Sequence, residues 1–187
     1  MLKHVVFLDR DGVINADSPD YVISWEEFFF IPKSRQAIAD LCAAGCTLFV
    51  VTNQSAVHRK MITVSELERL HRKMIAAIED RGGKIQDVFY CPHLPEEGCL
   101  CRKPKPGLLL EAQRRYGIDL STAFMVGDSE KDMVCGRAAG CRYAVLVRTG
   151  NGRQAEKRLK EKGQPPDHIA PDLFSAARWI LSRRRND

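Results

Sequence analysis

Short apolar runs alternate along this chain with longer segments whose apolar residues have helical spacing. This alternation is typical of a parallel β-sheet in which helices connect successive strands. The sequence indicates six strands, at residues 4–8, 47–51, 85–90, 123–126, 143–147 and, more weakly, 168–170. We therefore expect an α/β fold, a Rossmann-like doubly wound parallel sheet.

Helix start and stop signals fill the intervals between these strands. Thr63 and Glu66 form a capping-box pattern that predicts a helix start, and the helical pattern continues to Arg81. Pro106 suits the first turn of a helix that ends near Gly117. No low-complexity linker interrupts the pattern, so we predict a single domain over residues 1–187. Further helices are expected at residues 33–44, 130–139, 153–162 and 172–183.

Composition and charge are those of an ordinary soluble protein. Of 187 residues, 44% are hydrophobic and 28% are charged, and the apolar N-terminal run is too short for a signal peptide or a membrane span. We expect a cytoplasmic protein, and a monomer because no apolar helix face looks spare. Much of the net charge of +5 comes from residues 153–160 and Arg183-Arg184-Arg185, where no aromatic residues are interleaved. That pattern favours solvated surfaces and anionic small-molecule ligands over a nucleic-acid partner or a membrane.

Polar side chains cluster where three of the expected strands end. Asp9-Arg10-Asp11 follows the first strand, Thr52-Asn53-Gln54 the second and Gly127-Asp128 the fourth. The carboxyl ends of parallel strands share one edge of the sheet, where open α/β folds bind ligands. An ordinary strand-to-helix turn explains one such cluster easily and three together poorly. We therefore expect a functional site at this edge.

The carboxylates of Asp9 and Asp11 are close enough in sequence to repel one another unless a cation or a proton intervenes. Mg²⁺ suits them, because it binds a few protein oxygens and keeps positions for water and a substrate phosphate. Asp128 brings a further carboxylate, and Asp132 could hold Asp128 in place or bind a water. Such a centre can present a phosphoryl group for in-line attack by an aspartate.

On electrostatic grounds, Thr52 can supply a neutral donor and Lys103 a cation for the phosphoryl oxygens. Four short motifs therefore stand in order along the chain: Asp9-Arg10-Asp11-Gly12-Val13, Thr52-Asn53-Gln54, Lys103 and Gly127-Asp128-Ser129-Glu130-Lys131-Asp132. They resemble the four motifs of the haloacid dehalogenase superfamily of phosphatases. The resemblance implies that Asp9 is the nucleophile and Asp11 the general acid/base. It also implies that Mg²⁺ is bound by the Asp9 side chain, the Asp11 backbone carbonyl and Asp128, in a fold of haloacid dehalogenase type without a cap domain.

A second metal site is predicted in one loop, residues 91–101. Cys91, His93, Cys99 and Cys101 offer three thiolates and one imidazole, which match a tetrahedral structural Zn²⁺ site with no position open for catalysis. Free thiols beside an incidental histidine are the alternative, but four ligands within eleven residues argue against it. Arg102 and Lys103 directly follow the last cysteine, so the metal would fix the loop and direct these two cations toward the substrate. We expect the other four cysteines to be small buried hydrophobes without disulfides.

The zinc pattern and Cys101-Arg102-Lys103-Pro104 narrow the resemblance to two groups of phosphatases. One acts on the 7-phosphate of D-glycero-D-manno-heptose 1,7-bisphosphate in lipopolysaccharide or glycan precursor synthesis, and the alternative group acts on histidinol phosphate. The stretches at residues 9–15, 52–55 and 103–107 resemble the heptose group, which implies a small sugar phosphate substrate of undecided anomer. Arg102 could pair bidentately with the second phosphate of a bisphosphate. Substrate contacts are implied for Arg10, Asp17, Tyr21, Asn53, Gln54, Ser55 and Arg102.

Two other functions fit parts of the sequence. A zinc-stabilised nucleic-acid-binding module would use the zinc loop and the basic tail, but carboxylates repel a polyanion unless they bind metal. That module gives no role to Asp9, Asp11 and Asp128. A nucleic-acid 3′-phosphatase would need a long basic groove, which the sequence does not indicate. The expected activity is therefore that of a phosphoric monoester hydrolase that uses Mg²⁺ and acts on a small molecule.

Overall fold

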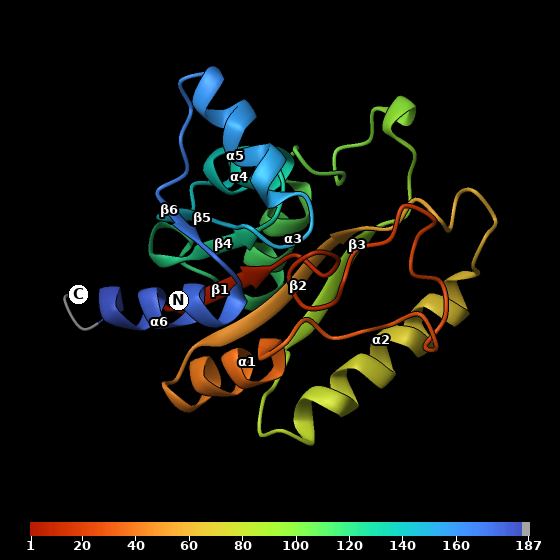
Figure 1. The fold of residues 1–187 in the computed structure, drawn as a ribbon, viewed down its shortest axis with the longest axis horizontal. Coiled ribbons are helices and arrows are strands. Elements are labelled where there is room, and N and C mark those ends of the chain that lie inside the picture. The colour runs from red at the N-terminus through yellow and green to blue at the C-terminus, as the bar shows by residue number, and fades with distance from the viewer. Residues whose placement is uncertain (185–187) are drawn as a thin grey trace.

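The computed structural model describes residues 1–184 and contains a fully parallel sheet with helices on both faces (Figure 1). The strands lie in the order β3-β2-β1-β4-β5-β6. This arrangement confirms the predicted α/β fold. Residues 185–187, which include Arg185 of the basic tail, lie outside the described residues. The strands are β1 (Val5–Leu8), β2 (Thr47–Asn53), β3 (Asp87–Cys91), β4 (Phe124–Gly127), β5 (Tyr143–Val147) and β6 (His168–Ala170).

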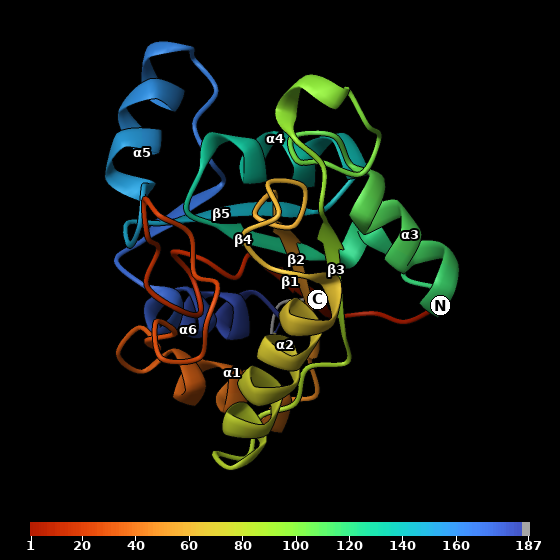
Figure 2. The same cartoon turned by 90° about the vertical axis from the view of Figure 1, so that its right-hand side faces the viewer.

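Two layers of helices cover the sheet, three on each side (Figure 2). One layer holds α1 (Ser34–Ala43), α2 (Val64–Glu79) and α6 (Leu173–Arg184), and the other holds α3 (Gly107–Tyr116), α4 (Glu130–Ala139) and α5 (Gly152–Glu161). All four residues of β1 are buried, because successive side chains point to opposite faces of the sheet and helices cover both faces. Val6 and Leu8 pack in the core below α1, α2 and α6, whereas Val5 and Phe7 pack in the core with α3.

The capping box predicted at the start of α2 is confirmed. The Thr63 hydroxyl accepts a hydrogen bond from the Glu66 N–H at 3.2 Å, and the Glu66 carboxylate accepts one from the Thr63 N–H at 2.8 Å. Two short 3₁₀ helices, Pro95–Glu97 and Leu120–Thr122, were not predicted, because single turns of this kind leave no apolar periodicity. No described helix could cross a membrane, since none combines the necessary length with sufficient hydrophobicity.

Strand β2 runs two residues further than the predicted 47–51, and β3 begins and ends later than the predicted 85–90. Ladder pairing continues from Val51 to Thr52 opposite Tyr90 and to Asn53 opposite Cys91. Backbone hydrogen bonding tolerates polar side chains at a strand end, which the apolar pattern does not register. Thr52 and Asn53 therefore lie inside β2 rather than after it, and their side chains point to opposite faces.

The topology has a switch point at β1, the strand that lies between β2 and β4. The chain passes from β1 to β2 by way of α1 on one face, and from β3 to β4 by way of α3 on the other. Open α/β sheets form a crevice where successive connections leave on opposite faces. The carboxyl ends of β1, β2 and β4 all border this crevice, so the predicted polar clusters lie together.

Candidate active site

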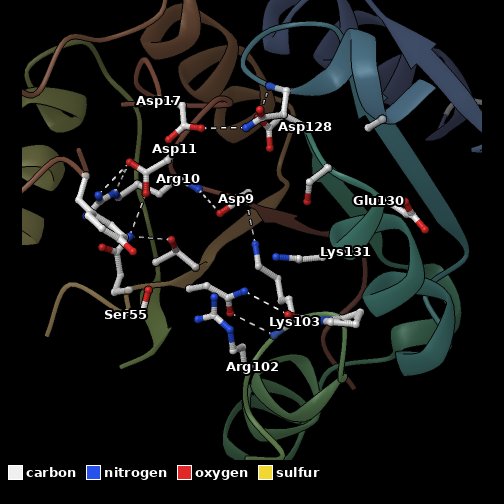
Figure 3. Close-up of a pocket in the computed structure, with 18 of the residues that line it drawn as sticks. Asp9, Arg10, Asp11, Asp17, Ser55, Arg102, Lys103, Asp128, Glu130 and Lys131 are labelled. Atoms are coloured by element: carbon white, nitrogen blue, oxygen red, sulfur yellow. Dashed lines mark hydrogen bonds and ion pairs between the residues drawn. The ribbon is translucent and has the colours of Figure 1, made fainter. Parts of the chain in front are cut away.

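A cavity of about 630 Å³ opens at the carboxyl edge of the sheet (Figure 3). Every residue predicted to act in catalysis, to contact substrate or to bind Mg²⁺ contributes to its wall. The structure thus brings together side chains that are far apart in the sequence. The predicted residues at this wall are Asp9, Arg10, Asp11, Asp17, Tyr21, Thr52, Asn53, Gln54, Ser55, Arg102, Lys103 and Asp128.

Lys103 lies at the centre of the site, between two carboxylates. Its Nζ is 2.9 Å from Asp9 Oδ2 and 2.6 Å from Asp132 Oδ1, and its side chain is only 2% exposed. Burial alone would lower the pKa of Lys103, but the negative charges of Asp132 and Asp9 raise it above its ordinary value. Asp132 thus pairs with Lys103, a contact that the sequence did not indicate.

The carboxylate oxygens of Asp9, Asp128 and Asp132 lie within 4.8 Å of one another. Burial raises the pKa of Asp9, with repulsion from Asp132 and Asp128 acting against the charge of Lys103. Burial and the charge of Asp132 also raise the pKa of Asp128, to about 7. One ammonium cannot neutralise three buried carboxylates, so this donor set fits a hard dication such as Mg²⁺.

Removal of Mg²⁺ is expected to cost more stability at about pH 8 than at about pH 5. The pKa of Asp128 is about 7 in the folded protein and near its ordinary 3.8 in the unfolded chain. At pH values between these two, the metal-free folded state therefore keeps a proton on Asp128 that the unfolded state has lost. Stability of the metal-free protein therefore falls as pH rises through this window, by a few kcal/mol in total, and Mg²⁺ offsets that loss. Thermal unfolding with and without Mg²⁺ at both pH values checks this. An equal Mg²⁺-induced shift at both would contradict it.

A tight backbone cradle surrounds Asp128. The Asn151 N–H donates to Asp128 Oδ2 at 2.7 Å. Gly12 and Gly150 have φ values of +80° and +53°, and a Cβ at either would lie 2.1 Å from the same oxygen. The Asn151 side chain also donates to Asp17 Oδ2 at 2.8 Å, which links the loop that carries Asp17 to the segment that holds the Asp128 carboxylate. Sequence reasoning missed Asn151, although its position just beyond β5 at the same sheet edge was a usable signal.

The Asp11 carboxylate is held by several donors. Arg10 donates to Asp11 Oδ1 from Nε at 3.1 Å and from a terminal nitrogen at 2.8 Å. Asn15 donates to the same oxygen, and Gln54 donates to Asp11 Oδ2, both at 2.9 Å. Burial would raise the pKa of Asp11, but the charge of Arg10 and these hydrogen bonds lower it overall. These donors fix the orientation of the Asp11 carboxylate and favour its ionised form.

Arg10 borders the cavity, yet its side chain is only 1% exposed. Its guanidinium lies 3.3 Å from His71 Nε2, donates to the Val22 carbonyl at 3.4 Å and lies over the Phe28 ring. Burial, followed by the charge of Arg10, lowers the pKa of His71 to about 3, so this imidazole is neutral. The structure thus places the Arg10 charge behind Asp11 rather than in the open cavity.

Polar and cationic groups also line the cavity around Thr52 and Tyr21. Gln54 donates to Thr52 Oγ1 at 2.9 Å, which leaves the threonine hydroxyl proton free to bond a ligand. A hydrogen bond with Ser55 and the charges of Arg59 and Arg102 lower the pKa of Tyr21. Tyr21 therefore lies among donors that suit an anion.

The predicted zinc ligands also converge. The Cys101 sulfur lies 3.1 Å from the Cys91 sulfur, 3.5 Å from the Cys99 sulfur and 3.2 Å from His93 Nδ1. All four ligand atoms lie within 4.8 Å of one another, and three thiols with an imidazole are donors that Zn²⁺ prefers. Arg102 donates to the His93 carbonyl at 2.9 Å, which ties its guanidinium to this loop. None of the seven cysteines forms a disulfide. Of the four outside this cluster, Cys46 and Cys135 are buried as predicted, whereas Cys42 and Cys141 are only partly buried.

Comparison with known proteins agrees with this geometry. Residues 100–176 match a family model described as HAD-hydrolase-like. A D-glycero-β-D-manno-heptose-1,7-bisphosphate 7-phosphatase of Pseudomonas aeruginosa is 45% identical over 97% of this chain and 99% of its own length. The chain belongs to this family of phosphatases. A second member, from Bordetella bronchiseptica, is 42% identical over 95% of this chain and 97% of its own length.

Solved structures of the heptose bisphosphate phosphatase family share the fold. The crystal structure of D,D-heptose 1,7-bisphosphate phosphatase from B. bronchiseptica, complexed with magnesium and phosphate, matches with a TM-score of 0.88. It is 40% identical, and the match covers 96% of this chain and 98% of that chain. A second such phosphatase, from Burkholderia thailandensis, matches with a TM-score of 0.72 at 33% identity and covers 96% and 99% of the two chains.

Proposed function

We propose that this protein hydrolyses the 7-phosphate of D-glycero-β-D-manno-heptose 1,7-bisphosphate, with Mg²⁺ as its catalytic metal. The reaction is supported above all by one observation, the buried contact of Lys103 with Asp9 beside the carboxylate of Asp128. The choice of sugar and of its β-anomer rests on the names of the relatives, which align along nearly the whole chain. The histidinol phosphate alternative has no support among these relatives.

The proposed reaction has two steps. Asp9 attacks phosphorus, the bond to the sugar oxygen breaks, and Asp11 donates a proton to that oxygen. Asp11 then takes a proton from a water molecule that attacks phosphorus, and the bond to Asp9 breaks. The negative charge of the bound phosphate raises the pKa of the adjacent Asp11, which favours the proton that the first step needs. Bound Mg²⁺, held by Asp9, the Asp11 carbonyl and Asp128, would supply positive charge to the phosphoryl oxygens, while Thr52 and Lys103 donate to them.

The second phosphate of the substrate is expected to bind near Arg102. One guanidinium nitrogen of Arg102 donates to the His93 carbonyl of the zinc loop. The remaining donors of Arg102 can bind an anion near Tyr21 and Arg59. Arg102→Met should raise KM for the bisphosphate by about 10- to 100-fold, since a charged hydrogen bond contributes about 1.5–3 kcal/mol. The KM for a simple monophosphate should stay nearly constant. Steady-state kinetics on both substrates measures this, and equal KM changes would contradict it.

A panel of four phosphate esters tests the proposed substrate. It contains the β- and α-anomers of the heptose bisphosphate, histidinol phosphate and a 3′-phosphorylated oligonucleotide. We expect the highest kcat/KM for the β-anomer and release of only the 7-phosphate. A comparable kcat/KM for histidinol phosphate would overturn the choice of substrate.

We also propose that Cys91, His93, Cys99 and Cys101 hold a structural Zn²⁺ ion. The convergence of four soft and borderline donors in one irregular loop supports this. The ion would hold the loop that carries Arg102 and Lys103. We further propose a cytoplasmic monomer, because few large hydrophobic side chains are exposed among residues 1–184 and, apart from Met61 and Val64, they come from separate segments of the chain. Light scattering at the mass of one chain checks the monomer, and the mass of a dimer would contradict it.

Cys99→Ser is expected to lower the thermal unfolding midpoint and to raise KM. Loss of one thiolate weakens the zinc site, and a loosened loop no longer holds Arg102 in place. Metal analysis should show loss of zinc from this variant. Cys42→Ser is the matched control, because the Cys42 sulfur bonds only to the main chain of Lys84, outside the cluster. An unchanged zinc content in Cys99→Ser would contradict the assignment.

A further inference from the structure

We infer that Asn53 is a positioning residue that clamps the main chain of Lys103 and so sets where its ammonium meets the phosphoryl group. The resemblance implied a substrate contact for Asn53 instead. This inference rests on the proposed phosphatase function and names the means by which its lysine is held. The observation that carries it is a closed pair of hydrogen bonds between one side-chain amide and one residue of the backbone.

Both polar ends of the Asn53 amide bond to the main chain of Lys103. Its Nδ2 donates to the Lys103 carbonyl at 3.1 Å, and its Oδ1 accepts from the Lys103 N–H at 3.0 Å. These two bonds use the same backbone N–H and carbonyl groups of Lys103 that a neighbouring β-strand would pair with. An amide is well suited to this, because it offers a donor and an acceptor side by side.

The alternation along β2 explains why Asn53 points toward Lys103. Asn53 lies two residues beyond Val51, whose side chain packs in the core with α3, so both point to the same face of the sheet. The segment that carries Lys103 runs over that face toward the start of α3. Thr52, one residue earlier, points to the other face.

The end of β2 also holds the entry to the zinc loop. Asn53 pairs with Cys91 in the sheet register, and the Gln54 N–H donates to the Cys91 carbonyl at 2.7 Å. Gln54 therefore holds the start of the zinc loop at Cys91, and the adjacent Asn53 holds Lys103, two residues beyond the end of that loop. The Asn53 amide closes this loop at the point where the catalytic cation leaves it.

Lys103 depends on such a clamp because no regular structure holds its backbone. It lies between β3 and α3, in a segment that is neither helix nor strand. Its ammonium must nevertheless stay within 2.9 Å of Asp9 and 2.6 Å of Asp132. A misplacement of about 1 Å in a catalytic group can slow a reaction by on the order of 100-fold.

The test compares Asn53→Ala and Asn53→Asp with the wild type on two substrates, the heptose bisphosphate and p-nitrophenyl phosphate. Because Lys103 acts on the phosphoryl group shared by both, we expect kcat/KM to fall by the same factor on each, about 10- to 100-fold. The affinity for inorganic phosphate in the presence of Mg²⁺ should fall as well. Asn53→Asp keeps the side-chain volume and the acceptor but turns a carboxylate toward the Lys103 carbonyl, so it should lose activity without a packing defect. Gln36→Ala, which removes an exposed amide bonded to Asp40 on α1, should change none of these.

Three results would overturn the inference. A loss confined to the heptose bisphosphate would make Asn53 a substrate contact. A lower unfolding midpoint with unchanged kcat/KM on both esters would make it merely structural. Unchanged phosphate affinity in both Asn53 variants would separate it from Lys103. Failure of the proposed substrate gives a different pattern, in which the wild type binds phosphate and cleaves the aryl ester but spares the heptose.

Discussion

Asp9→Asn is expected to reduce phosphatase turnover by at least about 10,000-fold while the protein stays folded. An amide nitrogen or oxygen is a poor nucleophile for phosphorus, and Asp132, the other carboxylate beside Lys103, is fully buried. The substitution conserves size and removes one of the buried carboxylates whose mutual repulsion and burial raise the pKa of Asp9. We therefore expect the metal-free variant to be at least as stable as the wild type at neutral pH.

Steady-state kinetics and thermal unfolding measure both parts of this prediction. Asp80→Asn is the matched control, because Asp80 is exposed at the end of α2, away from the cavity. Appreciable turnover by Asp9→Asn, after contamination and deamidation are excluded, would show that the covalent route is wrong.

Lys103→Met is expected to lower both activity and stability. Methionine has a similar length without the charge, so Asp9 and Asp132 would be left as buried carboxylates without their ammonium partner. Removing one partner of a buried ion pair typically costs about 3–5 kcal/mol. The phosphoryl group would also lose its cation, for which we expect a fall in kcat of about 1,000-fold.

The stability loss in Lys103→Met should become smaller when Mg²⁺ is present, because the metal offsets the same negative charge. Chemical denaturation with and without Mg²⁺ measures this, and Lys84→Met, at an exposed lysine, serves as the control. A variant with wild-type stability and wild-type kcat would mean that Lys103 is not the central cation of the site.

The sheet and its functional edge were predictable because a buried strand requires a run of neighbouring apolar residues, which the sequence shows directly. Val5, Val6, Phe7 and Leu8 are fully buried, and such a run of apolar residues is what a central parallel strand requires. The polar residues that follow such strands must lie at one edge of the sheet. This is why the cluster of Asp9, Asp11 and Asp128 could be inferred before any distances were known.

The side-chain partners within the site could not be predicted, because they depend on how separate loops pack. Asn151 bonds to Asp17 across 134 positions of the sequence, and Asn53 bonds to Lys103 across 50. Neither contact has a periodicity or a spacing that the sequence records. The turn of Arg10 toward His71 is of the same kind, since it is set by the packing of α2 against the first loop.

A crystal structure with Mg²⁺ and beryllofluoride, a mimic of an aspartyl phosphate, tests the central claim most directly. We predict beryllium bonded to an Asp9 carboxylate oxygen, with Lys103 and Thr52 donating to the fluorides and Mg²⁺ bound between Asp9 and Asp128. Beryllofluoride on another residue, or a metal bound away from these two carboxylates, would contradict the account.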